Sequence, residues 1–301
     1  MPDDFLLSRA NVAICGLGLM GGSLALALRG KCASLLGVDP LPATVELALS
    51  LSIVDRAQTD PAQLLPQADL VILAAPILQI VALIERLPAL TSRPCVVLDV
   101  GSTKRIVLEA MSRLPENFDP IGGHPICGKE NLSLANAEAT LYHGAPFLLT
   151  PLARTSPRAM RAADQAIEAI GAHSVIVDAA EHDRMLAATS HLPFLISSAL
   201  ALSAPGGAAG FVGSGFKSAS RLAGTPASMM TGVLRSNREN VLAALARFQE
   251  SLREVEAALR SEEEAVLPSV LDRSRAAYRS LAAKESPTEN VTRDKISKFS
   301  I

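Results

Sequence analysis

Three glycines near the start of the chain have the spacing of a phosphate-binding turn. Gly16, Gly18 and Gly21 follow a short apolar run and fit the pattern G-x-G-x-x-G. The first glycine of this pattern permits a tight turn, the second lets the backbone approach a pyrophosphate, and the third lets the next helix pack against the strand. We expect this helix to begin near Leu19 and Met20, with its partly positive N-terminus directed at the phosphates. The segment therefore predicts a dinucleotide site and a redox enzyme, and it leaves the substrate open.

An acidic residue further along supports a particular dinucleotide. Asp39 ends the second apolar run, 23 positions after Gly16. A carboxylate at that point accepts hydrogen bonds from the ribose hydroxyls and repels a 2′-phosphate, so the pattern favours NAD over NADP. Ala75 and Pro76 follow a third apolar run, where small residues let the backbone approach the cofactor. The alternative is a glycine-rich turn in some other α/β protein.

One histidine has a setting suited to acid–base chemistry. His124 lies in the segment GGHPICG, and an imidazole needs only modest tuning to act as a base at neutral pH. We expect the adjacent glycines and proline to fix an irregular loop, although a lone loop histidine is more often structural. Ser102 could hydrogen-bond near His124, or it could cap a helix that begins at Lys104. Lys104 itself is expected to be a solvated residue of the first helical turn.

Three further side chains could bind a ligand. His182 and His191 lie nine residues apart on one expected helix, so they should point to different faces. A chelating pair would need a spacing of four residues, and no metal site is expected. The guanidinium of Arg221 is well shaped to bind a carboxylate at two points, although an isolated arginine is more often a surface residue.

The candidate site residues can form one site only if the carboxyl ends of several strands lie side by side in one sheet. We expect strands at residues 12–15, 35–38, 70–74, 95–99, 118–121, 146–149 and 174–177, and helices at 43–50, 77–86, 104–112 and 157–170. Apolar runs without alternation are typical of strands covered on both faces. The pattern predicts a Rossmann-like, doubly wound α/β sheet, whose ligands lie beyond the carboxyl ends of the strands.

The second part of the chain has a helical pattern. We expect a long helix at 179–202 that is kinked by Pro193, a helix at 236–260 that begins with a capping box of Ser236 and Glu239, and a helix at 262–284. The expected division is a dinucleotide-binding domain at 1–178, an all-α domain at 179–285 and a disordered tail at 286–301. Because a few helices alone make a thin core, we expect much of the apolar surface of this all-α domain to be buried between subunits, and a monomer in which the domain packs only on the sheet is the alternative.

Composition excludes several classes of partner. The 301 residues are 49% hydrophobic and 19% charged, and their net charge of −2 predicts no attraction to nucleic acid or membrane surfaces. The four cysteines are scattered, which fits reduced thiols and a cytoplasmic location. We expect neither a signal peptide nor an apolar run near the ~18 residues of a membrane span.

Taken in order, several segments resemble the prephenate/arogenate (cyclohexadienyl) dehydrogenase family of tyrosine biosynthesis. They are GLGLMGGSLA at 16–25, DVGSTK at 99–104, GGHPICGKE at 122–130, SHLPF at 190–194, FKSASRLAGTP at 216–226 and NREN at 237–240. The resemblance implies a Rossmann-like domain followed by a helical domain that forms a homodimer. It also implies NAD-dependent oxidative decarboxylation of a small-molecule substrate, either prephenate to 4-hydroxyphenylpyruvate or arogenate to tyrosine.

The resemblance also implies roles for individual residues. His124 would polarise the substrate hydroxyl and Ser102 would hydrogen-bond the same region. Arg221 would bind a substrate carboxylate, His191 would line the pocket and Glu130 would lie at its mouth.

One position departs from the family pattern. The family often has SHLPH where this chain has SHLPF, so Phe194 replaces a histidine that contacts substrate. The departure leaves open the choice between prephenate and arogenate, and it leaves open inhibition by tyrosine.

Two other functions remain as alternatives. A β-hydroxyacid dehydrogenase would need a catalytic lysine on the 179–202 helix, which has none; Lys217 is the nearest. A dinucleotide-binding protein without catalysis is the second alternative.

Overall fold

The computed structural model describes residues 4–129 and 133–282. Glu130 and the expected tail at 286–301 lie outside the described residues. By its internal contacts the chain divides into two compact units, Met1–Ala244 and Leu245–Ile301.

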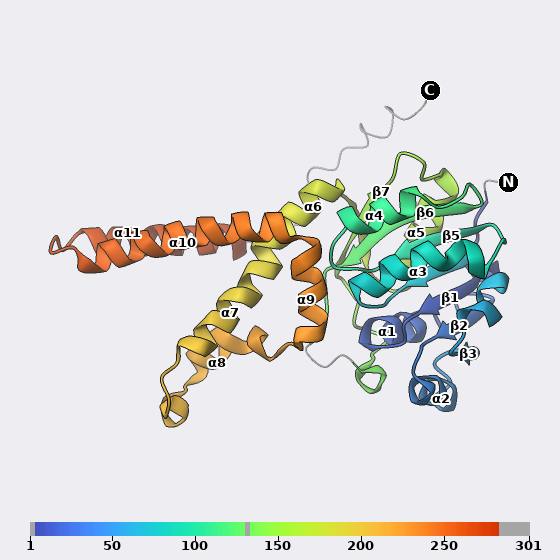
Figure 1. Ribbon diagram of the computed structural model, residues 1–301, viewed down its shortest axis with the longest axis horizontal. Coiled ribbons are helices and arrows are strands. Elements are labelled where there is room, and N and C mark those ends of the chain that lie inside the picture. Colours follow the sequence, from blue (N-terminus) through green and yellow to red (C-terminus); the bar gives the residue numbers. More distant parts are fainter. Residues whose placement is uncertain (1–3, 130–132, 283–301) are drawn as a thin grey trace. The chain divides into compact units, whose positions relative to one another are not determined.

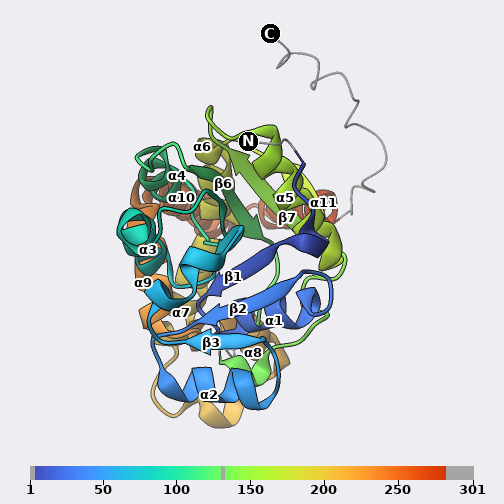
Figure 2. The ribbon, with the colours of Figure 1, turned by 90° about the vertical axis from the view of Figure 1, so that its right-hand side faces the viewer.

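The first unit is built on one sheet of eight strands in the order β3-β2-β1-β4-β5-β6-β7-β8. All neighbouring strands are parallel except β6 and β7. Figure 2 shows β3, β2 and β1 side by side, with β6 and β7 further along the sheet. The strands are β1 Asn11–Cys15, β2 Ser34–Val38, β3 Arg56–Gln58, β4 Leu70–Leu73, β5 Cys95–Asp99, β6 Phe118–Pro125, β7 Pro146–Pro151 and β8 His173–Ile176.

Helices cover both faces of this sheet, as Figure 1 shows. They are α1 Leu19–Leu28, α2 Pro42–Ser50, α3 Ile77–Leu90, α4 Arg105–Ser112 and α5 Pro157–Ala169. Buried residues of α1, α2 and α5 join one apolar core, and those of α3 and α4 join the core on the opposite face. This arrangement confirms the predicted doubly wound α/β fold.

Two parts of the sheet differ from our expectations. The short edge strand β3 was not predicted, because its three residues are Arg, Ala and Gln, and only Ala57 is buried. Strand β6 continues to Pro125, so His124 lies in regular strand opposite Leu148 of β7 and not in an irregular loop. The two glycines before it serve close packing: a Cβ on Gly123 would lie 2.7 Å from the carbonyl oxygen of Asp99.

The chain after β8 is helical, as predicted. It forms α6 Ala179–Leu186, a π turn Ala187–His191, α7 Leu192–Ser203, α8 Ser214–Ser220, α9 Ala227–Ser236, α10 Arg238–Arg260 and α11 Val266–Ala282. Short 3-10 turns lie at Leu7–Arg9, Pro61–Gln63, Leu65–Gln67, Leu134–Asn136, Ala208–Phe211 and Arg221–Gly224.

Two helix boundaries correct the expectations from sequence. Pro193 lies in the first turn of α7, and the irregularity before it is a π turn in which the Leu192 amide donates to the Ala187 carbonyl. The predicted capping box is wrong, because Ser236 is the last residue of α9 and its hydroxyl lies 2.9 Å from that of Thr103. Helix α10 begins after Asn237 instead.

The continuous helical run Ala179–Ser203 is more apolar than we expected. Its mean hydropathy reaches 1.5, and by length and composition alone it could cross a membrane. This corrects the expectation that no apolar run approaches that length. Only 17% of its apolar window is buried, and a helix that packs against a protein partner has the same composition.

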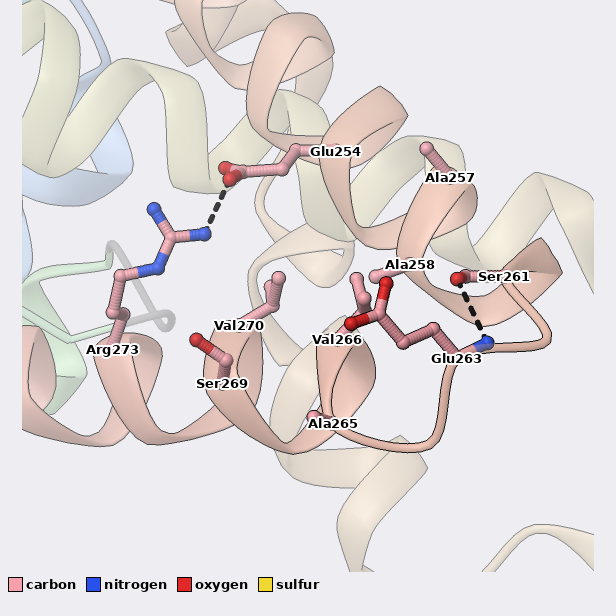
Figure 3. Close-up of a pocket in the computed structure, with 10 residues that line it drawn as sticks. All are labelled: Glu254, Ala257, Ala258, Ser261, Glu263, Ala265, Val266, Ser269, Val270 and Arg273. Carbon is pink, nitrogen blue, oxygen red and sulfur yellow. Dashed lines mark hydrogen bonds and ion pairs between the residues drawn. The ribbon is translucent and has the colours of Figure 1, made fainter.

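The second unit contains the end of α10 and the helix α11, joined by a short connection. Figure 3 shows the groove between them, which is lined by small and apolar side chains such as Ala258 and Val270. One ion pair crosses this groove, between the Arg273 guanidinium and Glu254. Outward-facing Leu259 and Tyr278 are 70% and 71% exposed, so this unit leaves apolar surface uncovered.

Candidate active site

The glycine turn between β1 and α1 has the backbone that a dinucleotide site needs. Gly16 has a φ of +97°, and a Cβ there would lie 2.5 Å from the carbonyl oxygen of Ala74. A Cβ on Gly21 would lie 1.8 Å from the Gly16 carbonyl oxygen, so the helix packs on the turn only because both residues are glycine. Gly18 precedes α1 without a side-chain cap, which leaves first-turn amides for a phosphate.

The acidic residue at the end of β2 is tied to this turn. Oδ2 of Asp39 accepts from the Leu17 amide at 2.9 Å, and Oδ1 accepts from the Leu41 amide at 3.0 Å. Each carboxylate oxygen retains a further lone pair for a ribose hydroxyl. The residues around this turn therefore fit a bound NAD.

Other residues predicted to bind the cofactor lie around the same turn. The amide of Ala75 is 3.1 Å from the position of a Cβ on Gly16, and Pro76 caps α3 directly beyond it. Leu19 is buried beneath the first turn of α1, so it can contribute its backbone only. The carbonyl of Met20 accepts from the buried Tyr142 hydroxyl at 2.7 Å.

A buried ion pair lies under the ends of β5 and β6. The ammonium of Lys104 donates to Asp99 Oδ2 and to the carbonyl of Gly123, and both charged side chains are completely buried. Burial lowers the pKa of Lys104, and the Asp99 carboxylate opposes this. The expectation of a solvated Lys104 is therefore wrong. Asp99 also accepts from the Gly123 amide at 3.0 Å, so the pair fixes the residue before His124.

Two hydrogen-bonded side chains, Asp183 and His182, lead to the imidazole of His124. Oδ1 of Asp183 lies 2.8 Å from Nδ1 of His182, and Nε2 of His182 lies 2.9 Å from Nδ1 of His124. Asp183 in turn accepts from the amides of Lys104 and Arg105 at 2.7 and 3.0 Å. It therefore caps α4, the role that sequence gave to Ser102 as one alternative.

The direction of these hydrogen bonds fixes the state of His124. An ionised carboxylate only accepts, so His182 donates from Nδ1 and accepts at Nε2. His124 must then donate from Nδ1, which leaves the lone pair of its Nε2 available as an acceptor. The bonds from His182 and the two amides lower the pKa of Asp183 against the opposing effect of its burial.

His124 is held in its neutral form. Burial lowers the pKa of His124 well below 6.5, and its electrostatic interactions with His182, Lys104 and His191 act in the same direction. A neutral imidazole with a free lone pair is the form that accepts a proton from a hydroxyl. The strand end at His124 therefore has the chemistry of a general base.

His191 joins the same group of residues. It is buried at the end of the π turn, and its Nδ1 lies 3.2 Å from Nδ2 of Asn237, which also donates to the backbone carbonyl of Asp183. The expectation that His182 and His191 point to different faces assumed a regular helix. The wider π turn between them rotates His191, so both histidines lie around Asp183.

Burial of His191 predicts a pH-dependent stability. Its pKa falls from 6.5 to about 4, chiefly because burial disfavours the charged form. As the pH drops below 6.5 the unfolded chain binds this proton and the folded chain does not, so stability is complete above that pH and is lost progressively towards pH 4. We expect the midpoint of urea unfolding to fall as the pH is lowered from 6.5 to 4, and to fall less steeply in the His191→Gln variant. An identical pH dependence in both proteins would contradict this.

The remaining predicted site residues are half-buried or exposed. Ser102 is half-buried between β5 and α4 and makes no hydrogen bond within the described part of the chain. Arg221 is exposed at the first residue of its 3-10 turn, next to α7. Phe194 is half-buried on α7.

Sequence reasoning missed Asp183, Lys104 and Asn237 as members of the site. Their partners are up to 79 residues away in the chain, so spacing alone gives no signal. The adjacent pair His182-Asp183 in the first turns of a helix was the one available indication, because a carboxylate beside a histidine suggests an oriented imidazole.

Together, a dinucleotide turn and a neutral histidine base at the carboxyl edge of a doubly wound sheet define an NAD-dependent dehydrogenase. Two sequence profiles match the chain: "Prephenate dehydrogenase, nucleotide-binding domain" over residues 24–176 and "Prephenate dehydrogenase, dimerization domain" over residues 178–273. The chain therefore belongs to the prephenate dehydrogenase family.

Individual relatives agree with this assignment. The chain is 28% identical to prephenate dehydrogenase of Bacillus subtilis, over 82% of this chain and 68% of the relative. It is 26% identical to cyclohexadienyl dehydrogenase of Zymomonas mobilis, over 84% and 89% of the two chains.

Solved structures show the same similarity. Prephenate dehydrogenase from A. aeolicus, solved with hydroxyphenyl propionate and NAD+, superposes with a TM-score of 0.84 at 29% identity, over 91% of this chain and 99% of that one. Synechocystis arogenate dehydrogenase gives a TM-score of 0.76 at 29% identity, and the superposition covers 90% of this chain and 99% of that one.

Proposed function

We propose that this chain oxidises and decarboxylates prephenate, or its amino analogue arogenate, with NAD as the oxidant in tyrosine biosynthesis. The observation that carries the proposal is the Asp183–His182–His124 chain, which presents an acceptor nitrogen in a protein of this family. The products are 4-hydroxyphenylpyruvate or tyrosine, together with carbon dioxide and reduced cofactor.

The residues of the site suit this reaction. His124 accepts a hydrogen bond from the C4 hydroxyl of the substrate, which stabilises the positive charge that develops at C4 as its hydrogen leaves with two electrons. Bound NAD supplies the acceptor for that hydride. Loss of the carboxylate as carbon dioxide returns an electron pair to the ring and makes it aromatic. The shared proton stays on the phenol oxygen, so none is released overall.

The other site roles belong to the same proposal. Ser102 lies in the segment before α4 and would hydrogen-bond near the substrate hydroxyl. Arg221 would bind a substrate carboxylate, because a guanidinium matches two carboxylate oxygens. Glu130 would lie at the pocket mouth, on a segment outside the described residues.

The proposed quaternary state is a homodimer formed through the helical part, in a soluble cytoplasmic enzyme without nucleic-acid or membrane partners. Large apolar side chains support it: Leu202 of α7 is 87% exposed and Phe211 is 92% exposed. A second subunit would cover such surface, and the match to a dimerization domain agrees.

The proposed boundary between the dinucleotide-binding domain and the helical domain lies between residues 178 and 179. It is close to the point where the two matched profiles meet, since the first ends at residue 176 and the second begins at residue 178.

The decisive experiment for the reaction type measures two products together. We expect one carbon dioxide for each reduced cofactor when prephenate is oxidised. Reduced cofactor without carbon dioxide would instead indicate a simple hydroxyacid dehydrogenase.

Asp39→Asn tests the cofactor preference. We expect the KM for NAD to rise about tenfold and the discrimination against NADP to narrow, since one charged acceptor of the ribose hydroxyls is lost. Initial rates with each cofactor measure both effects. Asp60→Asn is the matched control, because Asp60 is an exposed cap of the turn Pro61–Gln63. Equal use of NAD and NADP by the unmodified protein would contradict the role of Asp39.

A further inference from the structure

His191 carries a buried nitrogen without a partner. The residue is 1% exposed, and its Nε2 makes no hydrogen bond within the described residues. Buried polar atoms are almost always paired, because leaving one unpaired is unfavourable. An unpaired nitrogen in a candidate active site therefore points to a ligand atom that completes the bond.

Asn237 determines which nitrogen of His191 carries the proton. Its Oδ1 accepts from Nδ2 of Asn240 at 2.8 Å, so its Nδ2 faces the other two partners. That Nδ2 donates to the Asp183 carbonyl at 2.6 Å and lies 3.2 Å from Nδ1 of His191. Because an amide nitrogen only donates, Nδ1 of His191 must accept.

The amide of Asn237 is held rigidly. The residue joins α9 to α10, its backbone amide donates to Val233 at 3.2 Å, and its carbonyl accepts from Val241 at 3.0 Å. Its side chain is buried, with 4% of the residue exposed. A rigid corner of this kind can impose one orientation on a neighbouring imidazole.

We propose that Asn237 is a positioning residue that keeps the proton of His191 on Nε2, so that this nitrogen donates a hydrogen bond to a carboxylate oxygen of the substrate. The inference rests on the proposed function and adds a second, opposite role to the site. His124 presents a lone pair to a hydroxyl, whereas His191 presents an N–H to an anion. The substrate proposed above carries both groups.

Charges around His191 agree with a neutral donor. Burial brings its pKa to about 4 against the attraction of the Asp183 carboxylate, and its other neighbour on α6, His182, acts in the same direction as burial. His191 and Lys104 both influence His124, which places these groups around one site. At neutral pH His191 therefore carries one ring proton, and Asn237 decides its position.

Nitrogen NMR spectra of the full-length protein test the proton position directly. The chain has five histidines, so the signals can be assigned by single replacements. We expect His191 in the unmodified protein to be protonated at Nε2. In Asn237→Asp the new carboxylate accepts, so the proton should move to Nδ1. Protonation of His191 at Nδ1 in the unmodified protein would overturn the proposal.

Kinetics with prephenate test the consequence. We expect Asn237→Asp to raise the KM for prephenate by about tenfold or more, the scale of one hydrogen bond to a charged group, with kcat and the KM for NAD much less affected. A moved proton with an unchanged KM for prephenate would overturn the role in substrate binding.

A matched pair at His191 keeps the test valid if Asn237→Asp does not fold. The amide nitrogen of Gln extends to the region of Nε2 in His191→Gln, whereas the shorter side chain of His191→Asn does not reach it. We expect the KM for prephenate to rise about tenfold more in His191→Asn than in His191→Gln. Equal values would count against the donor. Failure of the unmodified protein to oxidise prephenate or arogenate would refute the proposed function, while the spectra would still report on Asn237.

Discussion

His124→Asn is expected to lower kcat with prephenate by roughly 10²- to 10⁴-fold, the usual contribution of a positioned acid–base group. Asn is close in shape but presents no basic nitrogen at the position of Nε2. The free acceptor that His182 and Asp183 leave on His124 is thereby lost. Steady-state rates measure the effect, and NAD affinity should stay unchanged, because the glycine turn and Asp39 are separate from β6.

His173→Asn is the control for this replacement. His173 begins the exposed edge strand β8, so its loss should leave kcat within about twofold, as for most surface substitutions. A kcat in His124→Asn close to that of the unmodified protein would show that another group accepts the hydrogen bond. Loss of NAD binding in the same variant would instead mean that His124 supports the fold of the cofactor site.

Lys104→Met is expected to lower the free energy of unfolding by about 3–5 kcal/mol, because it leaves the Asp99 carboxylate buried without its cation. Two backbone amides, of Gly101 and Gly123, would still donate to Asp99, but they do not replace a full charge. Urea unfolding measures the change. The loss is a property of the pair, so a neutral pair should restore much of the stability.

The double replacement Asp99→Asn with Lys104→Met provides that neutral pair. We expect it to be more stable than Lys104→Met alone, since no uncompensated charge remains. Lys217→Met is the surface control, because Lys217 is exposed on α8 and its loss should change stability by less than about 0.5 kcal/mol. A Lys104→Met protein as stable as the Lys217→Met control would show that the ion pair carries no net stability.

Local chemistry along the chain was enough to predict the sheet and its cofactor turn. The central strands β1, β4 and β5 are continuous apolar runs, and such runs identify buried parallel strands without any tertiary information. The glycines at 16 and 21 are likewise required by local geometry, a positive φ and a close helix contact. These features depend on neighbours in sequence, so sequence reveals them.

The support for His124 could not be predicted in this way. Asp183 caps a helix that lies 79 positions earlier, and Asn237 reaches His191 across 46 positions. Lys104 looked solvated because a charged residue near a helix start usually is, and only its pairing with Asp99 across two strand ends makes its burial tolerable. Such partners become neighbours only when the sheet and the helices pack.

The π turn illustrates a second limit. The proline at 193 correctly marked an irregularity in the long helix, but a proline does not specify how the preceding turn adjusts. The structure uses a π turn, and the extra residue turns His191 towards Asp183 and Asn237. A regular helix would have separated the two histidines that the site brings together.

The most direct test of the central claim is the absorbance of reduced nicotinamide when the purified protein is mixed with NAD and either prephenate or arogenate. We predict cofactor reduction with at least one of the two. Reduction with only one would assign the substrate, and reduction with both would show that a pocket with Phe194 accepts either side chain. No reduction with either substrate would contradict the account.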